Sequence, residues 1–236
     1  MTNDEALAEL AKIRTPIVYD ALEKFDLRPR TEGLMDTSIR SVSPSLGPLV
    51  GYAVTGKVVG ELPPAEGERI VEWQQMWEYV QRAPGPKVMV SQDMDQPAAR
   101  SCSWGDVAAS IFLRLGAVGA ITNGGVRDLP EVEQLGFKLC APAAVVGHAH
   151  IRWIEINTPV KVGGLVVYPG DLIHADEHGV MTIPQEIPLD QLVSFIHKFL
   201  ESEKTVVDYC QTTENFDINH VVQLMKEHGE RTQAHM

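Results

Sequence analysis

Two aspartates and an arginine stand where predicted strands give way to predicted helices. Asp106 follows the strand-like run KVMVSQD, and Arg127 and Asp128 follow the wholly apolar run AVGAIT. Strands and helices alternate over residues 68–141, which predicts right-handed parallel crossovers. In such sheets the loops after the strands lie at one edge, where ligands usually bind. We therefore expect Asp106, Arg127 and Asp128 to project from the same edge.

These three side chains suit a site for a small anion and a divalent metal. Two neighbouring carboxylates repel each other unless a cation joins them, and hard cations such as Mg²⁺ and Mn²⁺ prefer oxygen ligands. Gly124 and Gly125 would let the backbone approach an anionic ligand, and Gly105 marks a helix start that can receive a carboxylate. A structural alternative stays open, in which the aspartates only begin helices and the arginine pairs with one of them.

The elements that position these residues indicate an α/β chain. Helical periodicity predicts helices within 3–13, 14–25, 67–83, 102–116, 128–136, 189–210 and 215–229, and strands are expected at 38–42, 51–60, 87–93, 117–122 and 137–141. Thr15 is the expected N-cap of the second helix. In the fourth, Val107, Ile111 and Leu115 form an apolar stripe and Gly116 ends the helix.

The second half of the chain is rich in short β runs. From residue 142 they alternate with Gly, Pro and Asp turns, which predicts antiparallel sheet or a small barrel-like wrap. No repeat or low-complexity linker interrupts the sequence. We expect one α/β domain over residues 1–236, with a β-rich second half and a C-terminal helical extension from about residue 188.

Composition excludes several function classes. The formal net charge of −12 argues against a nucleic-acid surface. Three widely spaced cysteines make no disulfide framework, which favours reduced thiols in a cytoplasmic protein. The N-terminus has no signal-peptide pattern, and no apolar run reaches the roughly 18–20 residues of a membrane span. We expect neither nucleic-acid nor membrane partners.

Other residues whose side chains could take part in chemistry are more simply interpreted as structural. His148 and His150 would share one face of a strand, and we expect surface or packing histidines there rather than a metal pair. Turn positions are expected for His174, His178 and Asp176. Core or subunit contacts are expected for Trp73, Trp77 and Trp153, and a place at the pocket wall for Trp104. No cysteine has a base in register and no lysine has a Schiff-base context, which disfavours covalent mechanisms.

Beyond these residues, the sequence resembles a known family. Asp106, twenty intervening residues and then Arg127–Asp128 resemble the D-x20-R-D pattern of the class II pyruvate aldolases. Those enzymes act on 4-hydroxy-4-methyl-2-oxoglutarate and 4-carboxy-4-hydroxy-2-oxoadipate, and their wider family includes the regulator of ribonuclease activity A. The blocks WGDVAASIFLRLGAVGAITNGGVRDLPEVEQLGFKLCA and NTPVKVGGLVVYPGDLIHADEHGVMTIP are similar to the family's central and β-rich blocks.

The resemblance implies a role for each candidate residue. Asp128 would bind Mg²⁺ or Mn²⁺ directly, and Asp106 would hold a metal-bound water. Arg127 would face the keto-acid oxygens and the developing enolate. The pyruvyl carboxylate would be held by the backbone amides at Gly105, Asp106 and Val107.

The resemblance also implies a fold and an assembly. The fold would be like the swivelling phosphohistidine domain, an α/β/β sandwich with C-terminal helices. The protein would form a homotrimer or homohexamer with sites between subunits. Glu203, on the C-terminal helix of a neighbouring chain, would reach the metal waters.

The implied function is a divalent-metal-dependent lyase. It would cleave a carbon–carbon bond of a short 2-oxo acid to give pyruvate, and the same enolate chemistry would allow oxaloacetate decarboxylation. The alternative is a non-catalytic binding protein like the ribonuclease regulator, whose members lack the acidic metal ligand present here. Methyl transfer would need a nucleotide-binding glycine motif, and NGGVRD is not one.

Three features depart from the family pattern. Asn123 stands where the family block usually has Asp, which should keep the turn while removing a charge. The segment VVGHAHIRWIEIN (145–157) replaces a Gly/Arg-rich stretch, and we expect it to face the distal part of the substrate. The segment GELPPAEGERIVEW (60–73) is unusual where relatives often have Asp-Asn.

Overall fold

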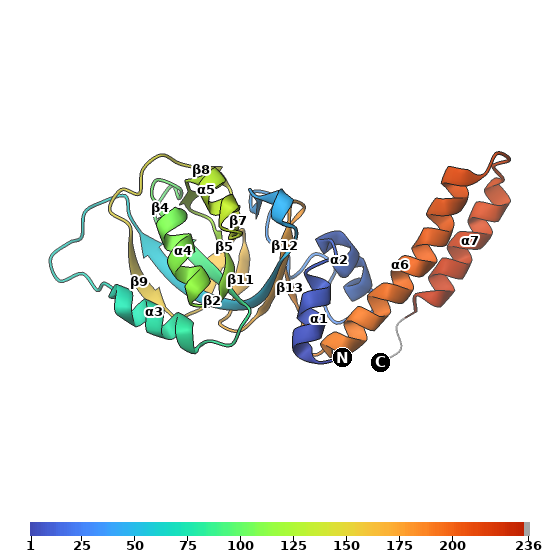
Figure 1. Cartoon of the computed structure of the whole chain (residues 1–236), viewed down its shortest axis with the longest axis horizontal. Helices are drawn as coiled ribbons and strands as arrows, with labels where there is room; N and C mark the ends of the chain where they lie inside the picture. The colour runs from blue at the N-terminus through green and yellow to red at the C-terminus, as the bar shows by residue number, and fades with distance from the viewer. Residues whose placement is uncertain (234–236) are drawn as a thin grey trace. The chain divides into compact units, whose positions relative to one another are not determined.

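The computed structural model describes residues 1–233, which form two compact units (Figure 1). The sheet unit is Gly33–Gln185. The helical unit joins Met1–Glu32 to the part of the chain that begins at Glu186. The helices near the two ends of the chain thus belong together, which the sequence patterns do not predict. That the whole chain behaves as one α/β domain stays a prediction.

The sheet unit is built on a mixed eight-stranded sheet with the order β1-β7-β5-β3-β2-β12-β13 and with β9 paired to β2. Its strands are β1 (Arg40–Ser41), β2 (Leu49–Val59), β3 (Lys87–Asp93), β5 (Ala117–Thr122), β7 (Lys138–Ala141), β9 (Arg152–Ile156), β12 (Leu172–Asp176) and β13 (Gly179–Ile183). The four central strands β2, β3, β5 and β7 pair in parallel, as the crossovers predict. The strands outside them pair antiparallel.

Each face of the sheet is covered by a different layer. The helices α3 (Trp73–Arg82), α4 (Asp106–Arg114) and α5 (Leu129–Gln134) cover one face, and the hairpin β10 (Val160–Val162) and β11 (Leu165–Val167) covers the other. Side chains of β3 alternate accordingly, since Met89 packs with the helices while Val88 and Val90 pack with the hairpin. The expected α/β/β sandwich with C-terminal helices is confirmed.

Some predicted boundaries are wrong. Helix α2 (Thr15–Glu23) has Arg14 as its N-cap, so Thr15 is the first helical residue instead of the cap. Helix α3 begins only at Trp73. Residues 102–104, expected to be helical, form a strand. The stripe predicted for α4 is also wrong as a core face, because the fully buried side chains are Ala109 and Phe112 while Val107 is 68% exposed.

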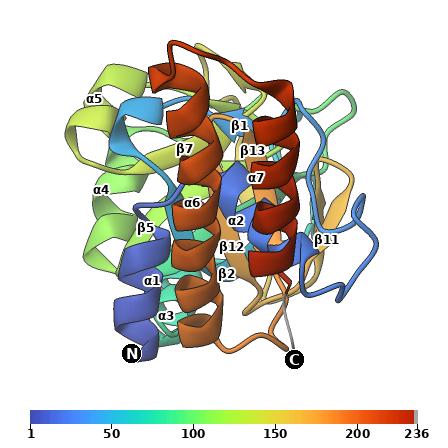
Figure 2. The same cartoon turned by 90° about the vertical axis from the view of Figure 1, so that its right-hand side faces the viewer.

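The helical unit contains α1 (Asn3–Leu10), α2, α6 (Leu189–Thr212) and α7 (Ile218–Arg231). Figure 2 shows α6 and α7 side by side. Phe25 and Phe195 pack edge to face with ring centroids 5.1 Å apart. Phe199 packs on the ring of His228, which also bonds Ser202 Oγ at 3.1 Å. No helix within the described residues combines the length and the apolar content that crossing a bilayer requires.

Candidate active site

A second, smaller sheet brings the candidate residues together. It consists of three parallel strands, β4 (Cys102–Trp104), β6 (Gly125–Val126) and β8 (Ala143–Ala144), which follow β3, β5 and β7 along the chain. The amide of Arg127 donates to the carbonyl of Trp104 at 3.0 Å, so the residues after β4 and after β6 become neighbours. The expectation that Asp106, Arg127 and Asp128 share one edge agrees with this arrangement.

Asp128 precedes helix α5 but does not cap it with its side chain. Its backbone is left-handed (φ 54°, ψ 39°), which is uncommon for any residue other than glycine. Its carboxylate turns instead toward the neighbouring strand: Oδ2 lies 3.2 Å from Arg127 Nε and accepts a long hydrogen bond of 3.4 Å from the Asp106 amide. This geometry disfavours the interpretation of Asp128 as a simple helix-start residue.

Several polar atoms of the site remain without a protein partner. The two terminal nitrogens of Arg127 make no hydrogen bond or ion pair within residues 1–233, and its side chain is 35% exposed. Asp128 Oδ1 and Asp106 Oδ2 are likewise unused among these residues. The site therefore offers a fork of cationic donors beside two carboxylate oxygens that can each accept a ligand.

Gly105 is required by the position of the Asp128 carboxylate. A Cβ added at Gly105 would lie 2.5 Å from Asp128 Oδ2 and 3.3 Å from the Arg127 side chain. Two of the three amides that the resemblance assigns to substrate are engaged here by carboxylates: Asp106 N donates to Asp128, and Val107 N donates to Asp106 Oδ1 at 2.7 Å. Substrate binding at the Val107 amide therefore requires the Asp106 side chain to turn away.

A cavity of about 680 Å³ opens beside these residues, within the usual size range of small-molecule sites. Gly105, Asp106, Val107 and Arg127 line it. Asp128 is not a lining residue, but its side chain is 32% exposed and lies beside Gly105 and Arg127. The remaining lining residues come from α3, from β4, from α4 and from the segments around residues 64–70 and 148–152.

The glycine pair and Asn123 have packing roles that the sequence did not reveal. A Cβ at Gly124 would meet the Asp93 side chain at 3.0 Å, and one at Gly125 would meet Val145 at 2.5 Å. Both glycines thus make room for protein side chains, and approach of their backbone to a ligand stays a prediction. Asn123 accepts a hydrogen bond from the Asp93 amide at 2.8 Å and donates one to the Asp93 carbonyl at 2.9 Å, which a carboxylate could not do.

Asp93 is a structural residue that the sequence patterns missed. It is 2% exposed, and its carboxylate accepts hydrogen bonds from the amides of Asp95 and Ala99 at 3.0 and 2.9 Å. Burial raises the pKa of Asp93, and the two amide hydrogen bonds oppose that shift. The residue fixes the loop between β3 and β4. The one feature of the sequence that could have indicated this role is the position of Asp93 at the end of a predicted strand.

Not all of the tryptophans lie where the sequence predicts. Trp104 is buried rather than part of the cavity wall, and its Nε1 donates to Ser91 Oγ at 2.9 Å. Trp153 is buried in the core as expected. Trp73 and Trp77 both line the cavity. Trp77 also packs against the core as expected, whereas Trp73 is 48% exposed. The sequence could not show this, because only the fold determines which helix face lacks a covering element.

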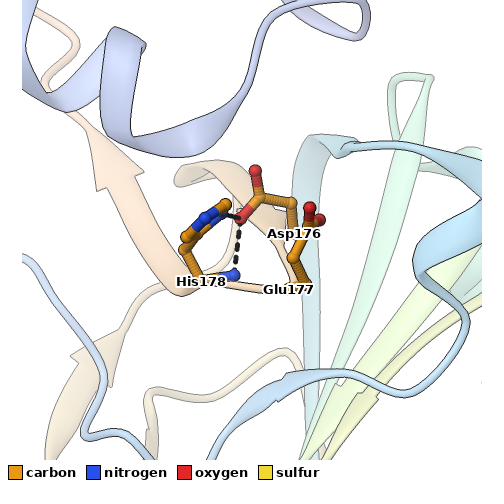
Figure 3. Close-up of side chains that lie close together, drawn as sticks. All are labelled: Asp176, Glu177 and His178. Atoms are coloured by element: carbon orange, nitrogen blue, oxygen red, sulfur yellow. Dashed lines mark hydrogen bonds and ion pairs between the residues drawn. The ribbon is translucent and has the colours of Figure 1, made fainter.

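The turn position expected for His174 is wrong, because this residue lies fully buried in strand β12, which is paired on both sides in the sheet. His148 and His150 lie in a loop rather than on a strand, and both are exposed at the cavity. Asp176, Glu177 and His178 are the one group of three closely spaced ligand-type side chains found within residues 1–233 (Figure 3). They form the β12–β13 turn, where Asp176 Oδ1 accepts a hydrogen bond of 2.8 Å from the His178 amide. The turn role expected for Asp176 and His178 thus agrees with the geometry.

Glu203 belongs to helix α6 of the helical unit. Its carboxylate acts on Asp20, whose pKa is raised first by burial and then by the negative charges of Glu23 and Glu203. Its role as a ligand donated by a neighbouring subunit stays a prediction.

This chain is similar to known proteins in sequence and in fold. The sequence matches the model of the RraA-like family, described as Aldolase/RraA, over residues 15–182. A relative in Halalkalibacterium halodurans carries the provisional name 4-hydroxy-4-methyl-2-oxoglutarate aldolase and is 28% identical over 122 residues, which cover 51% of this chain and 55% of the relative. The matched stretches span 18% to 58% of the length of the first curated relatives.

Two solved structures have the same fold. An uncharacterized protein from Pseudomonas syringae pv. tomato superposes with a TM-score of 0.71 at 20% identity, covering 96% of this chain and 95% of that one. Streptomyces coelicolor RraAS2, described as an unusual member of the RNase ES inhibitor RraA protein family, gives a TM-score of 0.65 at 20% identity, covering 86% of this chain and 96% of that one. At such identities the likeness shows the fold alone.

Proposed function

The chain belongs to the RraA-like (Aldolase/RraA) family, and on that premise we propose that it is a divalent-metal-dependent lyase. Its substrate would be a 4-hydroxy-2-oxo acid, which it would cleave between C3 and C4 to give pyruvate and a second carbonyl compound. Oxaloacetate decarboxylation is the related activity, because loss of CO₂ leaves the same enolate.

The observation that carries the proposal is the orientation of the Asp128 carboxylate. A residue that only began a helix would direct its carboxylate to the free amides of α5, whereas this one holds Arg127 and faces Gly105 from a left-handed backbone. The terminal nitrogens of Arg127 stay available to a ligand in a cavity of small-molecule size. This combination supports recognition of an anionic oxygen rather than helix capping.

The donor set fits a hard divalent cation. Asp128 Oδ1 and Asp106 Oδ2 are unused within the described residues, and two carboxylate oxygens completed by waters and substrate oxygens are typical of Mg²⁺. Asp128 would hold the ion directly and Asp106 through water. When bound, the ion would supply Lewis-acid polarisation of the 2-oxo group.

The residues of this chain would then perform the remaining tasks. Arg127 donates from its terminal nitrogens to the carboxylate and 2-oxo oxygens of the substrate, and its fixed charge favours the enolate over the ketone. The C4 hydroxyl loses its proton while the C3–C4 bond breaks, and the bonding electron pair moves to C3. Asp106, on the cavity wall, accepts that proton through a water and returns it to C3, which completes pyruvate.

A pyruvate-release assay tests the proposal. Purified protein is incubated with oxaloacetate and with 4-hydroxy-4-methyl-2-oxoglutarate, with Mg²⁺ or Mn²⁺ and then with excess EDTA. We expect metal-dependent pyruvate release that stops in EDTA and returns when metal is restored. Release at the full rate in excess chelator would refute the metal dependence. Absence of turnover with both substrates would favour the alternative of a non-catalytic, ribonuclease-regulator-like binding protein.

We also propose a homotrimer or a homohexamer, with Glu203 reaching the site of a neighbouring subunit. The proposal rests on the family resemblance. Light scattering at micromolar concentration tests it, and a monomeric mass would refute both the assembly and the shared site.

A further inference from the structure

The cavity extends well beyond the residues that would hold pyruvate. It follows one face of α4 from Asp106 to Ile111, a rise of about 7.5 Å at 1.5 Å per residue. Ile70, Trp73 and Trp77 line it together with Ile111. The two indole rings lie 6.2 Å apart with an interplanar angle of 33°. The part remote from the pyruvyl group is thus walled by aromatic and branched apolar side chains.

The one arginine that lines this remote part is paired with a carboxylate of the protein. Arg152 is 11% exposed and binds Glu68 through two contacts, Nε to Oε1 at 2.8 Å and Nη2 to Oε2 at 2.7 Å. Its Nη1 donates to the carbonyls of Leu62 and His150 at 2.8 and 3.1 Å. The arginine therefore ties the two atypical segments, 60–73 and 145–157, to each other. Four of its five N–H donors are engaged and its charge is paired with Glu68, so it is a poor partner for a carboxylate on the substrate.

The other polar groups of this part include the rings of His148, His150 and Trp77. His148 Nδ1 lies 3.0 Å from the Ala149 carbonyl, so Nδ1 carries a hydrogen and donates it to the protein. The buried Nε1 of Trp77 has no hydrogen-bond partner among the described residues, and it is an uncharged donor. Among the described residues that line the cavity, Arg127 is the arginine whose two terminal nitrogens are both unused, whereas Arg152 has four of its five N–H donors engaged by protein.

We propose that this site selects 2-oxo acids whose distal group is aromatic or similarly large and apolar, in preference to those with a distal carboxylate. The inference rests on the proposed lyase function, in which Arg127 binds the pyruvyl end. A distal carboxylate would lie against indole and aliphatic carbon without a counter-ion, which costs desolvation energy. A phenyl group would instead bury its surface between Trp73, Trp77 and Ile111.

Two pairs of compounds test the preference. Turnover is compared for 4-hydroxy-2-oxo-4-phenylbutanoate and 4-hydroxy-4-methyl-2-oxoglutarate by pyruvate release. Binding is compared for 2-oxo-4-phenylbutanoate and 2-oxoadipate by calorimetry and by quenching of tryptophan fluorescence. We expect the phenyl compounds to be favoured by about tenfold or more in kcat/KM and in Kd, as burial of an aromatic side group predicts.

Substitutions in the wall should change the preference. Ile111→Lys adds a cation to the remote wall and should reduce the ratio of phenyl to dicarboxylate kcat/KM by about tenfold or more. Val166→Lys, at an exposed position of strand β11 in the same unit, is the matched control and should leave the ratio unchanged. Trp73→Ala, at a residue that is 48% exposed, should weaken binding of the phenyl compound without unfolding the protein.

The outcomes separate the two proposals. If dicarboxylates are preferred, or if the wall variants leave the ratio unchanged, the distal-group inference is wrong while the lyase proposal stands. If no compound is cleaved but 2-oxo-4-phenylbutanoate still binds more tightly than 2-oxoadipate, the lyase proposal is wrong and the apolar preference of the cavity stands.

Discussion

Replacing Gly105 by alanine should disable the site without unfolding the chain. The added Cβ would lie 2.5 Å from Asp128 Oδ2, closer than the 3.0 Å below which real Cβ contacts essentially do not occur. The carboxylate must therefore retreat by roughly half an ångström to one ångström. A misplacement of about 1 Å can cost about 10²-fold in rate. Because Gly105 has an extended backbone (φ −140°), alanine itself introduces no backbone strain there.

The assay is pyruvate release with Mn²⁺, accompanied by a Mn²⁺ titration and a thermal melt. We expect kcat/KM for Gly105→Ala to fall by about 10²-fold, with weaker Mn²⁺ binding and little change in Tm. Gly147→Ala is the matched control, because the nearest atom to its added Cβ is 3.9 Å away. Activity of Gly105→Ala within about threefold of the parent would refute the idea that this glycine positions Asp128.

Two further predictions concern buried groups. Burial raises the pKa of Cys140 to about 12 and also raises that of Cys102, whereas Cys210 is exposed. A thiol reagent at pH 8 should therefore titrate Cys210 rapidly and the other two cysteines only after denaturation. Rapid reaction of all three in the native protein would contradict the structure. Asn123→Asp replaces a donor to a backbone carbonyl with a carboxylate oxygen and should cost about 1–3 kcal/mol of unfolding free energy, measured by urea denaturation. Asn157→Asp, whose side chain only accepts a hydrogen bond from Tyr79, is its control, and equal losses in the two variants would count against the argument.

Regular elements could be predicted from the sequence because their periodicity is set locally. Strands β3 and β5 have the limits that their apolar runs predict, Lys87–Asp93 and Ala117–Thr122. Their parallel pairing follows from the intervening helices, and it brings Asp106 and Arg127 to the same edge.

The smaller features could not be predicted, because strands of two or three residues have no measurable period. The sheet of β4, β6 and β8 appears only once the main strands are assembled, although it sets the contact between Arg127 and Trp104. The left-handed backbone of Asp128 is likewise imposed by its surroundings. Exposure of Trp73 to the cavity depends on which elements cover α3, which no local pattern records.

The central claim is that Asp128 holds a divalent metal and that Arg127 acts on the substrate beside it. The most direct measurement is a Mn²⁺ titration of the parent, Asp128→Ala and Arg127→Lys proteins by calorimetry, with thermal melts as the control for folding. We predict that Asp128→Ala loses Mn²⁺ binding while staying folded. Arg127→Lys should keep Mn²⁺ binding but lose about 10²–10³-fold in kcat, as removal of an oxyanion-type donor does. If Asp128→Ala binds Mn²⁺ as tightly as the parent, the assignment of the metal site is wrong.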